Sequence, residues 1–199
     1  MDKQEGQIQI TRLVDKYDRL TPAKRKEYNE SMTCRDFITP LFQALGWDIH
    51  NIYNDYEVTS EAQVSGKRVD YAFHLNNTTK FFLEAKKIAI DLREERWADQ
   101  AVMYAWHKSV PWAILTDFES LKVFNAEWKS SNPLQNLFFG LQCNQFLDRF
   151  EQLWLLSRES LEQGLIDTEA EKWGKKAKKV SVDKQLLSDL TRFRELLTK

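Results

Sequence analysis

The middle of the chain contains five short runs of apolar or alternating residues, and these constrain the fold more than any other feature. Each run is bounded by turn-forming residues and has the length of a β-strand. One stretch with apolar residues at helical spacing, residues 93–108, separates the third run from the fourth. This order of elements predicts an α/β or α+β domain. The expected strands are residues 56–64, 69–75, 80–85, 112–116 and 121–124.

Helical periodicity precedes the strands from about residue 11 to residue 45. The pair Thr21-Pro22 has the sequence of a helix start, and Gly46 has the position of a glycine that ends a helix. Pro40 falls inside the periodic pattern and predicts a kink or break just before it, because proline cannot donate the backbone hydrogen bond of a helix.

Helical periodicity returns at about Asn132, so we assign residues 1–130 to one domain and residues 131–199 to a helical extension. Five lysines lie within residues 172–179, and we interpret them as a solvated linker rather than a phosphate-binding patch. A final helix begins near Asp183 and has no capping glycine at the end of the chain. We therefore expect the extension to lead into a further domain.

Composition excludes several classes of protein. The chain has 29 Lys+Arg against 30 Asp+Glu, which argues against a basic nucleic-acid coat but not against a nucleic-acid enzyme rich in carboxylates. No apolar run approaches the roughly 18 residues of a membrane span, and the N-terminus lacks a signal-peptide core. Cys34 and Cys143 lie too far apart for a metal-binding pair, so we expect a cytoplasmic protein without a disulfide framework.

Three charged residues fall at the ends of neighbouring expected strands. Asp70 begins one strand, and Glu84 and Lys86 end the next on a shared face, because residues two apart in a strand point to the same side. Antiparallel pairing brings Asp70 beside them. Two adjacent carboxylates favour a divalent cation, and their hard oxygens suit Mg²⁺. Such an ion activates water and stabilises charge on a scissile phosphate, so the arrangement points to phosphodiester hydrolysis with Lys86 near the phosphate.

Glu-x-Lys alone is a weak motif, and the chain contains a second copy at Glu127 and Lys129, preceded by Asp117. We favour the first copy because the second leads into a polar loop with no helix behind it. Gln100 and Tyr104 lie one helical turn apart behind the first copy, where an amide and a hydroxyl suit a phosphate, the backbone or the lysine. The alternative for the first copy is a solvated strand end with a surface ion pair.

Three further residues have two interpretations each. Glu30 is either an additional metal ligand or a first-turn glutamate favoured by the helix dipole. Arg35 is a phosphate contact or a surface arginine. His107 follows Tyr104 by three residues and either approaches the site or ends the helix at the surface. The three histidines of the chain are not spaced as a zinc site.

Together these motifs resemble the PD-(D/E)xK nucleases, in the Gln-x-x-x-Tyr branch that includes N-terminal domains of type I restriction R subunits and of fused type IIG restriction–modification enzymes. The resemblance covers about residues 28 to 126 and departs from the pattern in having Val69, not proline, before Asp70. It implies a restriction-endonuclease-like α+β sandwich, with a mixed four- to five-stranded sheet flanked by helices and further C-terminal helices. The segments that carry it are Phe37 to Leu41, Leu45 to Asp48, Val69 to Tyr71, Leu83 to Lys86, Gln100, Tyr104 and Ala113 to Phe118.

The resemblance also implies an activity, which is cleavage of double-stranded DNA by a restriction endonuclease that uses Mg²⁺, with Mn²⁺ as a substitute. A repair or recombination nuclease of the RecB-like type and a non-catalytic binding domain on the same fold remain alternatives. Asp70 and Glu84 carry over as metal ligands together with Glu30. The full set comprises the catalytic residues Asp70, Glu84 and Lys86 and the supporting residues Gln100, Tyr104 and Glu30.

Two partners follow from the same resemblance. The 199 residues contain no Walker A and no Asn-Pro-Pro-Tyr methylase motif, so we expect a methyltransferase or helicase domain downstream of Lys199 on the same full-length chain. Cleavage of both DNA strands needs two active sites, so we expect a transient dimer on DNA.

Overall fold

The computed structural model describes the chain except for residues 54–55, 65–66, 129, 131, 177–188 and 195–199, and except for the side chains of residues 61–64 and 67–68. Within the described ranges, no helix combines the length and apolar character that a membrane span needs.

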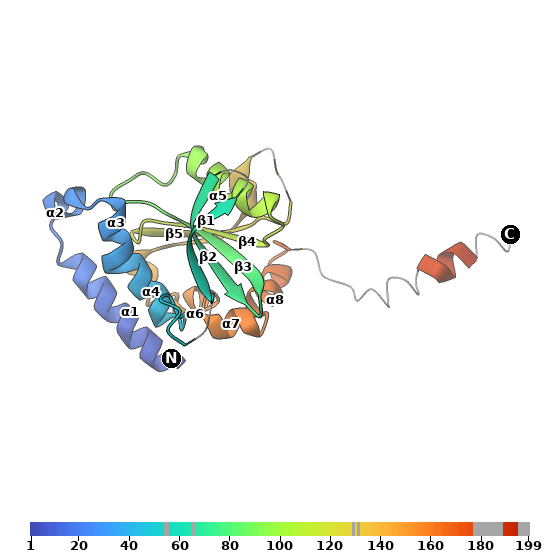
Figure 1. The fold of residues 1–199 in the computed structure, drawn as a ribbon, viewed down its shortest axis with the longest axis horizontal. Coiled ribbons are helices and arrows are strands. Elements are labelled where there is room, and N and C mark those ends of the chain that lie inside the picture. The colour runs from blue at the N-terminus through green and yellow to red at the C-terminus, as the bar shows by residue number, and fades with distance from the viewer. Residues whose placement is uncertain (54–55, 65–66, 129, 131, 177–188, 195–199) are drawn as a thin grey trace.

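A six-stranded mixed sheet forms the centre of the fold (Figure 1). The spatial order of the strands follows the chain, and all neighbours are antiparallel except β3 and β4. The parallel pair is joined by α5 (Glu95–His107), which crosses over the sheet. The strands are β1 (Val58–Val64), β2 (Lys67–Leu75), β3 (Thr78–Ala85), β4 (Trp112–Thr116), β5 (Ser120–Asn125) and β6 (Leu137–Gln142).

The predicted fold class is confirmed, and the sheet has one strand more than expected. The expectation of helix from Asn132 onward is wrong for β6, which follows the 3-10 turn η2 (Pro133–Asn136) and pairs with β5. A run as short as Leu-Phe-Phe-Gly-Leu has too few residues for periodicity to distinguish a strand from a helix. β6 adds to the same sheet, and the division of the chain at residue 130 stays a prediction.

The N-terminal third of the chain is helical, as predicted. Thr21 caps α2, since its side chain accepts a hydrogen bond from the Lys24 N–H at 3.2 Å. The break predicted before Pro40 is present as a π-helical turn (Cys34–Ile38). Pro40 has no N–H to give to the Asp36 carbonyl four residues earlier, and Lys16 Nζ donates to that oxygen instead, at 3.0 Å. The helices are α1 (Lys3–Asp18), α2 (Pro22–Glu27), α3 (Glu30–Thr33) and α4 (Thr39–Ala44).

Helix α1 begins earlier than predicted because Asp2 caps it, accepting from the Glu5 N–H at 2.8 Å. Gly46 has a φ of 89°, as expected of a glycine that ends a helix. Near the C-terminus, residues 189–194 are helical, whereas the predicted start of that helix near Asp183 lies outside the described residues.

Two apolar clusters cover the two faces of the sheet. The larger contains residues of α1, α4 and the C-terminal helices, including Ile10, Leu41 and Leu153, whereas the smaller lies under α5 and includes Ala101 and Ala105. Figure 1 shows the N-terminal helices in blue along one side of the sheet and the C-terminal helices in orange at one end. These C-terminal helices are α6 (Phe150–Trp154), α7 (Arg158–Glu162) and α8 (Leu165–Lys172).

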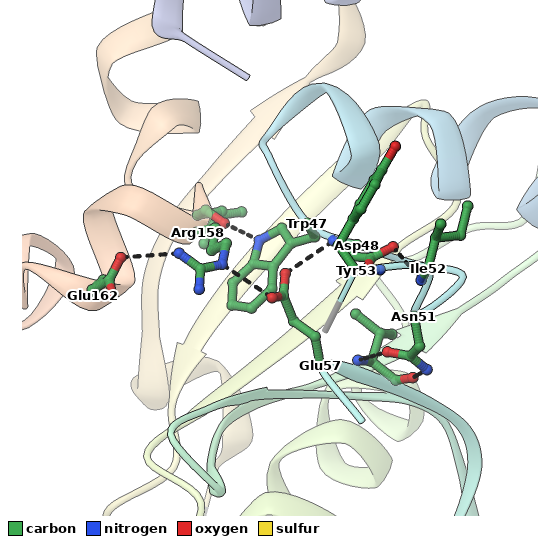
Figure 2. Close-up of polar contacts among 10 residues, drawn as sticks. Trp47, Asp48, Asn51, Ile52, Tyr53, Glu57, Arg158 and Glu162 are labelled. Carbon is green, nitrogen blue, oxygen red and sulfur yellow. Dashed lines mark hydrogen bonds and ion pairs between the residues drawn. The ribbon is translucent and has the colours of Figure 1, made fainter. Parts of the chain in front are cut away.

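A buried carboxylate joins the start of α7 to the segment between α4 and β1 (Figure 2). Glu57 is 5% exposed and accepts from the Asp48 N–H at 2.9 Å and from Arg158 Nε at 3.1 Å. Arg158 Nη1 donates in addition to Glu162, at 3.0 Å. This network holds the start of α7 against the chain directly before β1, which is an edge strand of the sheet.

The predicted solvated linker is wrong for Lys176, which is buried. Its Nζ lies 3.0 Å from a carboxylate oxygen of Glu127 and 2.6 Å from one of Asp167, so its charge is neutralised inside the fold. Spacing alone does not distinguish such a lysine from its exposed neighbours. Lys178 and Lys179 lie outside the described residues.

Candidate active site

The β2–β3 hairpin brings the two predicted carboxylates together. Tyr71 pairs with Leu83 across the hairpin, so Asp70 lies across from Glu84 one residue further along. Asp70 Oδ2 accepts a hydrogen bond from the Ala85 N–H at 2.7 Å, which ties the carboxylate to the end of β3. The turn Asn76-Asn77, in which both residues have positive φ, sets the register as far as His74. A bulge between Phe73 and His74 then shifts the register by one residue, so that Asp70 lies across from Glu84 and not from Leu83.

Glu84 is buried at the centre of this group, with 4% exposure, and Lys86 is 8% exposed. Lys86 Nζ and the Gln100 side-chain amide of α5 both donate to Glu84 Oε1. The other oxygen, Oε2, is buried and has no hydrogen-bond partner in the part of the chain that the structure describes. Burying a carboxylate oxygen without a partner costs free energy of folding, and a cation bound at that oxygen would offset this cost.

The carboxylates also perturb one another. Burial raises the pKa of Glu84 to about 7, and the charges of Asp70 and Glu30 raise it as well, while Lys86 opposes them. Burial and Asp70 likewise raise the pKa of Glu30, which Lys86 lowers. Glu30 therefore shares an electrostatic environment with the pair on the hairpin, although it comes from α3.

Helix α5 contributes a second layer behind the carboxylates. Tyr104 is hydrogen-bonded to Gln100, and burial together with the Glu84 charge raises the pKa of its hydroxyl. Trp97 lies one turn before Gln100, and Lys86 Nζ is 5.1 Å from the centre of its ring. Its position three residues before Gln100 places Trp97 on the same face of α5.

A cavity of about 530 Å³ opens beside Asp70. Glu30 and Asp70 line it from α3 and β2, and Arg35 and His50 line other parts of the wall. Glu30 is thus brought to the site. His50 was not predicted to lie here, because nothing in its surroundings in the sequence links it to the strand ends.

The donor set fits a small divalent cation. Mg²⁺ commonly uses one or two carboxylates and fills its remaining positions with water, so Asp70 and the unpartnered oxygen of Glu84 are suitable ligands. Among the described residues, no three His, Cys, Asp or Glu side chains form a ready group of metal ligands. The assignment of Glu30 as a third ligand therefore stays a prediction.

The second Glu-x-Lys copy is not assembled into a site. Asp117 follows the last residue of β4, whereas Glu127 lies beyond the opposite end of the β4–β5 hairpin, where Trp112 pairs with Asn125. Glu127 instead pairs with the buried Lys176. Lys129 lies outside the described residues.

Two other candidates lie at the surface. His107 is exposed at the end of α5, with its ring 5.0 Å from that of Trp106. Arg35 is exposed and donates two hydrogen bonds to Asp36, at 2.7 and 3.1 Å.

Comparison with protein-family models matches residues 29–137, more than half of the chain, to the family described as type I restriction enzyme R protein N terminus. The chain belongs to this family. The predicted resemblance to restriction-enzyme N-terminal domains is thereby confirmed. The matched span of this R-protein N-terminal family contains all six predicted site residues, from Glu30 to Tyr104.

Two individual proteins are similar to this member of the R-protein N-terminal family. One is the type II restriction enzyme and methyltransferase RM.Eco57I of Escherichia coli, which is 31% identical over 205 residues that cover 95% of this chain and 20% of that protein. The chain thus spans about a fifth of the length of this curated relative. The other is the crystal structure of the type IIG restriction endonuclease BpuSI, with a TM-score of 0.47, 19% identity and coverage of 70% of this chain and 17% of that one.

Proposed function

We propose that the chain is the DNA-cleaving domain of a restriction enzyme and that it hydrolyses phosphodiester bonds with a divalent cation held by Asp70 and Glu84. One observation carries the proposal. Within a restriction-enzyme family, a carboxylate on β3 is buried between a second carboxylate and a lysine and keeps one oxygen without a partner. A purely structural ion pair would gain from satisfying that oxygen.

Each residue has a separate task. A bound Mg²⁺, or Mn²⁺ in its place, supplies an activated water and stabilises charge on the phosphate. Asp70 is oriented by the Ala85 N–H, which fixes one of its oxygens at the end of β3. Gln100 holds Glu84 through Oε1, and the unpartnered Oε2 would be available as a ligand to the cation. Lys86 offsets negative charge on the scissile phosphate and orients the attacking water.

The relatives suggest what surrounds the domain. RM.Eco57I is named as both a restriction enzyme and a methyltransferase, and this chain spans about a fifth of its length. We therefore propose a methyltransferase on the same full-length protein as the partner of this domain. Cleavage of both strands of a DNA duplex would bring two copies together on the DNA.

The two Glu-x-Lys copies provide a matched test of the proposal. Lys86→Ala and Asp70→Asn should lower the rate of Mg²⁺-dependent DNA cleavage by the full-length protein at least about a hundredfold. The corresponding changes in the second copy, Lys129→Ala and Asp117→Asn, should leave the rate within about twofold of the wild type. Circular dichroism and urea unfolding verify that each variant is folded. Cleavage that survives in folded Lys86→Ala and Asp70→Asn variants would refute the proposal.

A further inference from the structure

We propose that the DNA strand to be cut reaches Asp70 through the 530 Å³ cavity beside α3 and α4, and that Arg35 and His50 contact its phosphates there. The inference rests on the proposed function and adds the path of the substrate. It assigns binding residues outside the set formed by Asp70, Glu84 and Lys86.

Burial restricts the direction from which a phosphate can approach. Asp70 lines the cavity, whereas Glu84 and Lys86 are almost fully buried. A cation held between the two carboxylates would therefore meet the substrate on the cavity side of Asp70.

The cavity wall offers the groups that bind DNA backbones. Most protein contacts to phosphate come from arginine, from small polar side chains and from backbone N–H groups. Arg35 uses Nε and Nη2 on Asp36, which leaves the other N–H groups of its guanidinium for a phosphate oxygen. His50 is exposed, and Gln43 and Ser60 add further polar atoms to the wall.

A second cavity, of about 650 Å³, lies at the same end of the sheet, beside the turn between β4 and β5. It serves as a comparison for the first cavity. The backbone N–H of Lys86 donates to the carbonyl of Thr116. The next residue, Asp117, lies in the wall of this second cavity, so the cavity is close to the end of β3. Its charged lining residues are the acidic Asp18, Asp91, Asp117 and Glu119 and the basic Arg25, Arg93 and Lys122.

Two cations of the second cavity have other contacts, whereas the third, Arg93, is paired with Asp91 as Arg35 is with Asp36. Lys122 Nζ donates to a backbone carbonyl at 2.7 Å, and Arg25 lies 4.0 Å over the ring of Tyr17. The lining of each cavity has one more carboxylate than Lys and Arg side chains, four against three in the second and two against one in the first. The contrast lies in the proposed divalent cation, which Asp70 and Glu84 would hold beside the first cavity and which would reverse the charge balance there.

The two cavities supply a matched pair of arginines for the test. Arg35 and Arg93 are both exposed, and each donates from Nε and Nη2 to the two oxygens of a nearby aspartate. Arg35→Ala and Arg93→Ala would be made in the Lys86→Ala background, which keeps both metal ligands and spares the DNA. Fluorescence anisotropy with a short labelled duplex and Mg²⁺ then gives the affinity over a range of salt concentrations.

Arg35→Ala should weaken binding up to roughly fivefold and lower the slope of log affinity against log salt by about 0.9, the value for one lost phosphate contact. His50→Ala should weaken binding in the same assay, whereas Arg93→Ala should change neither affinity nor slope. Equal effects of Arg35→Ala and Arg93→Ala, with binding otherwise intact, would overturn this inference alone. Absence of DNA binding in the parent protein would overturn the proposed function together with it.

Discussion

Asp117→Asn should stabilise the protein at pH 8 and give a smaller gain at pH 5. Asp117 is 1% exposed, and burial raises the pKa of its carboxyl from 3.8 to about 7. One of its oxygens accepts from the Ser120 N–H at 2.8 Å, and an asparagine side chain offers the same acceptor without the charge. The substitution therefore keeps the turn after β4 and removes a buried anion.

The magnitude follows from linkage between proton binding and folding. Between the unfolded pKa near 4 and the folded value near 7, the folded state binds the proton that the unfolded state has lost. Stability contributed by this group is therefore present at low pH and is lost as pH rises toward 7. Three pKa units correspond to about 4 kcal/mol, which is an upper limit for the gain because the new amide N–H groups need partners of their own.

Urea unfolding of the wild type and of Asp117→Asn at the two pH values measures the effect. The gain at pH 5 should be about 2 to 3 kcal/mol smaller than at pH 8. Asp99→Asn, an exposed change on α5, serves as the control and should stay within about 0.5 kcal/mol of the wild type at both. A pH-independent difference for Asp117→Asn, or destabilisation at pH 8, would contradict the argument from burial.

Three further predictions test other contacts. Arg158→Ala removes the cation beside buried Glu57 and should lower the free energy of unfolding in urea by about 2 kcal/mol; an unchanged midpoint would count against the network. Gly6→Ala places a methyl group 2.6 Å from a carbonyl oxygen of α4 and should cost about 1 to 3 kcal/mol in the same assay, and a neutral effect would show that α1 shifts freely. Trp97→Leu removes the ring beside Lys86 and should reduce kcat for cleavage several-fold with KM unchanged, whereas Trp97→Phe should lose less; equal kcat in both variants and the wild type would exclude this role.

The hairpin that positions the carboxylates could be predicted from the sequence, because the residues that form its turn are adjacent in the chain. The turn residues Asn76 and Asn77 and the alternation on either side predict the hairpin. The bulge between Phe73 and His74, which shifts the register by one residue and places Asp70 across from Glu84, was not predicted. The break before Pro40 was predictable, because it follows from the covalent structure of one residue.

Other features depend on contacts between distant segments. β6 exists as a strand because β5 offers it an edge, and its short apolar run has no signal of its own. The burial of Glu84 depends on how α5 lies over the sheet. The spacing in the sequence therefore predicted that Glu84 and Lys86 share a face, but not that they form a buried ion pair. Lys176 belongs to a run of lysines in the sequence, yet its partners Glu127 and Asp167 come from elsewhere in the chain.

Titration with a divalent cation tests the central claim most directly, namely that Asp70 and Glu84 hold a metal ion. Isothermal titration calorimetry with Mn²⁺ and Mg²⁺ at pH 8, above the raised pKa of Glu84, would compare the wild type with Asp70→Ala, Glu84→Gln and the control Asp117→Asn. The account predicts saturable binding in the wild type and in Asp117→Asn, and its loss in the other two variants. Unchanged binding in Asp70→Ala and Glu84→Gln, or no binding in the wild type, would contradict it.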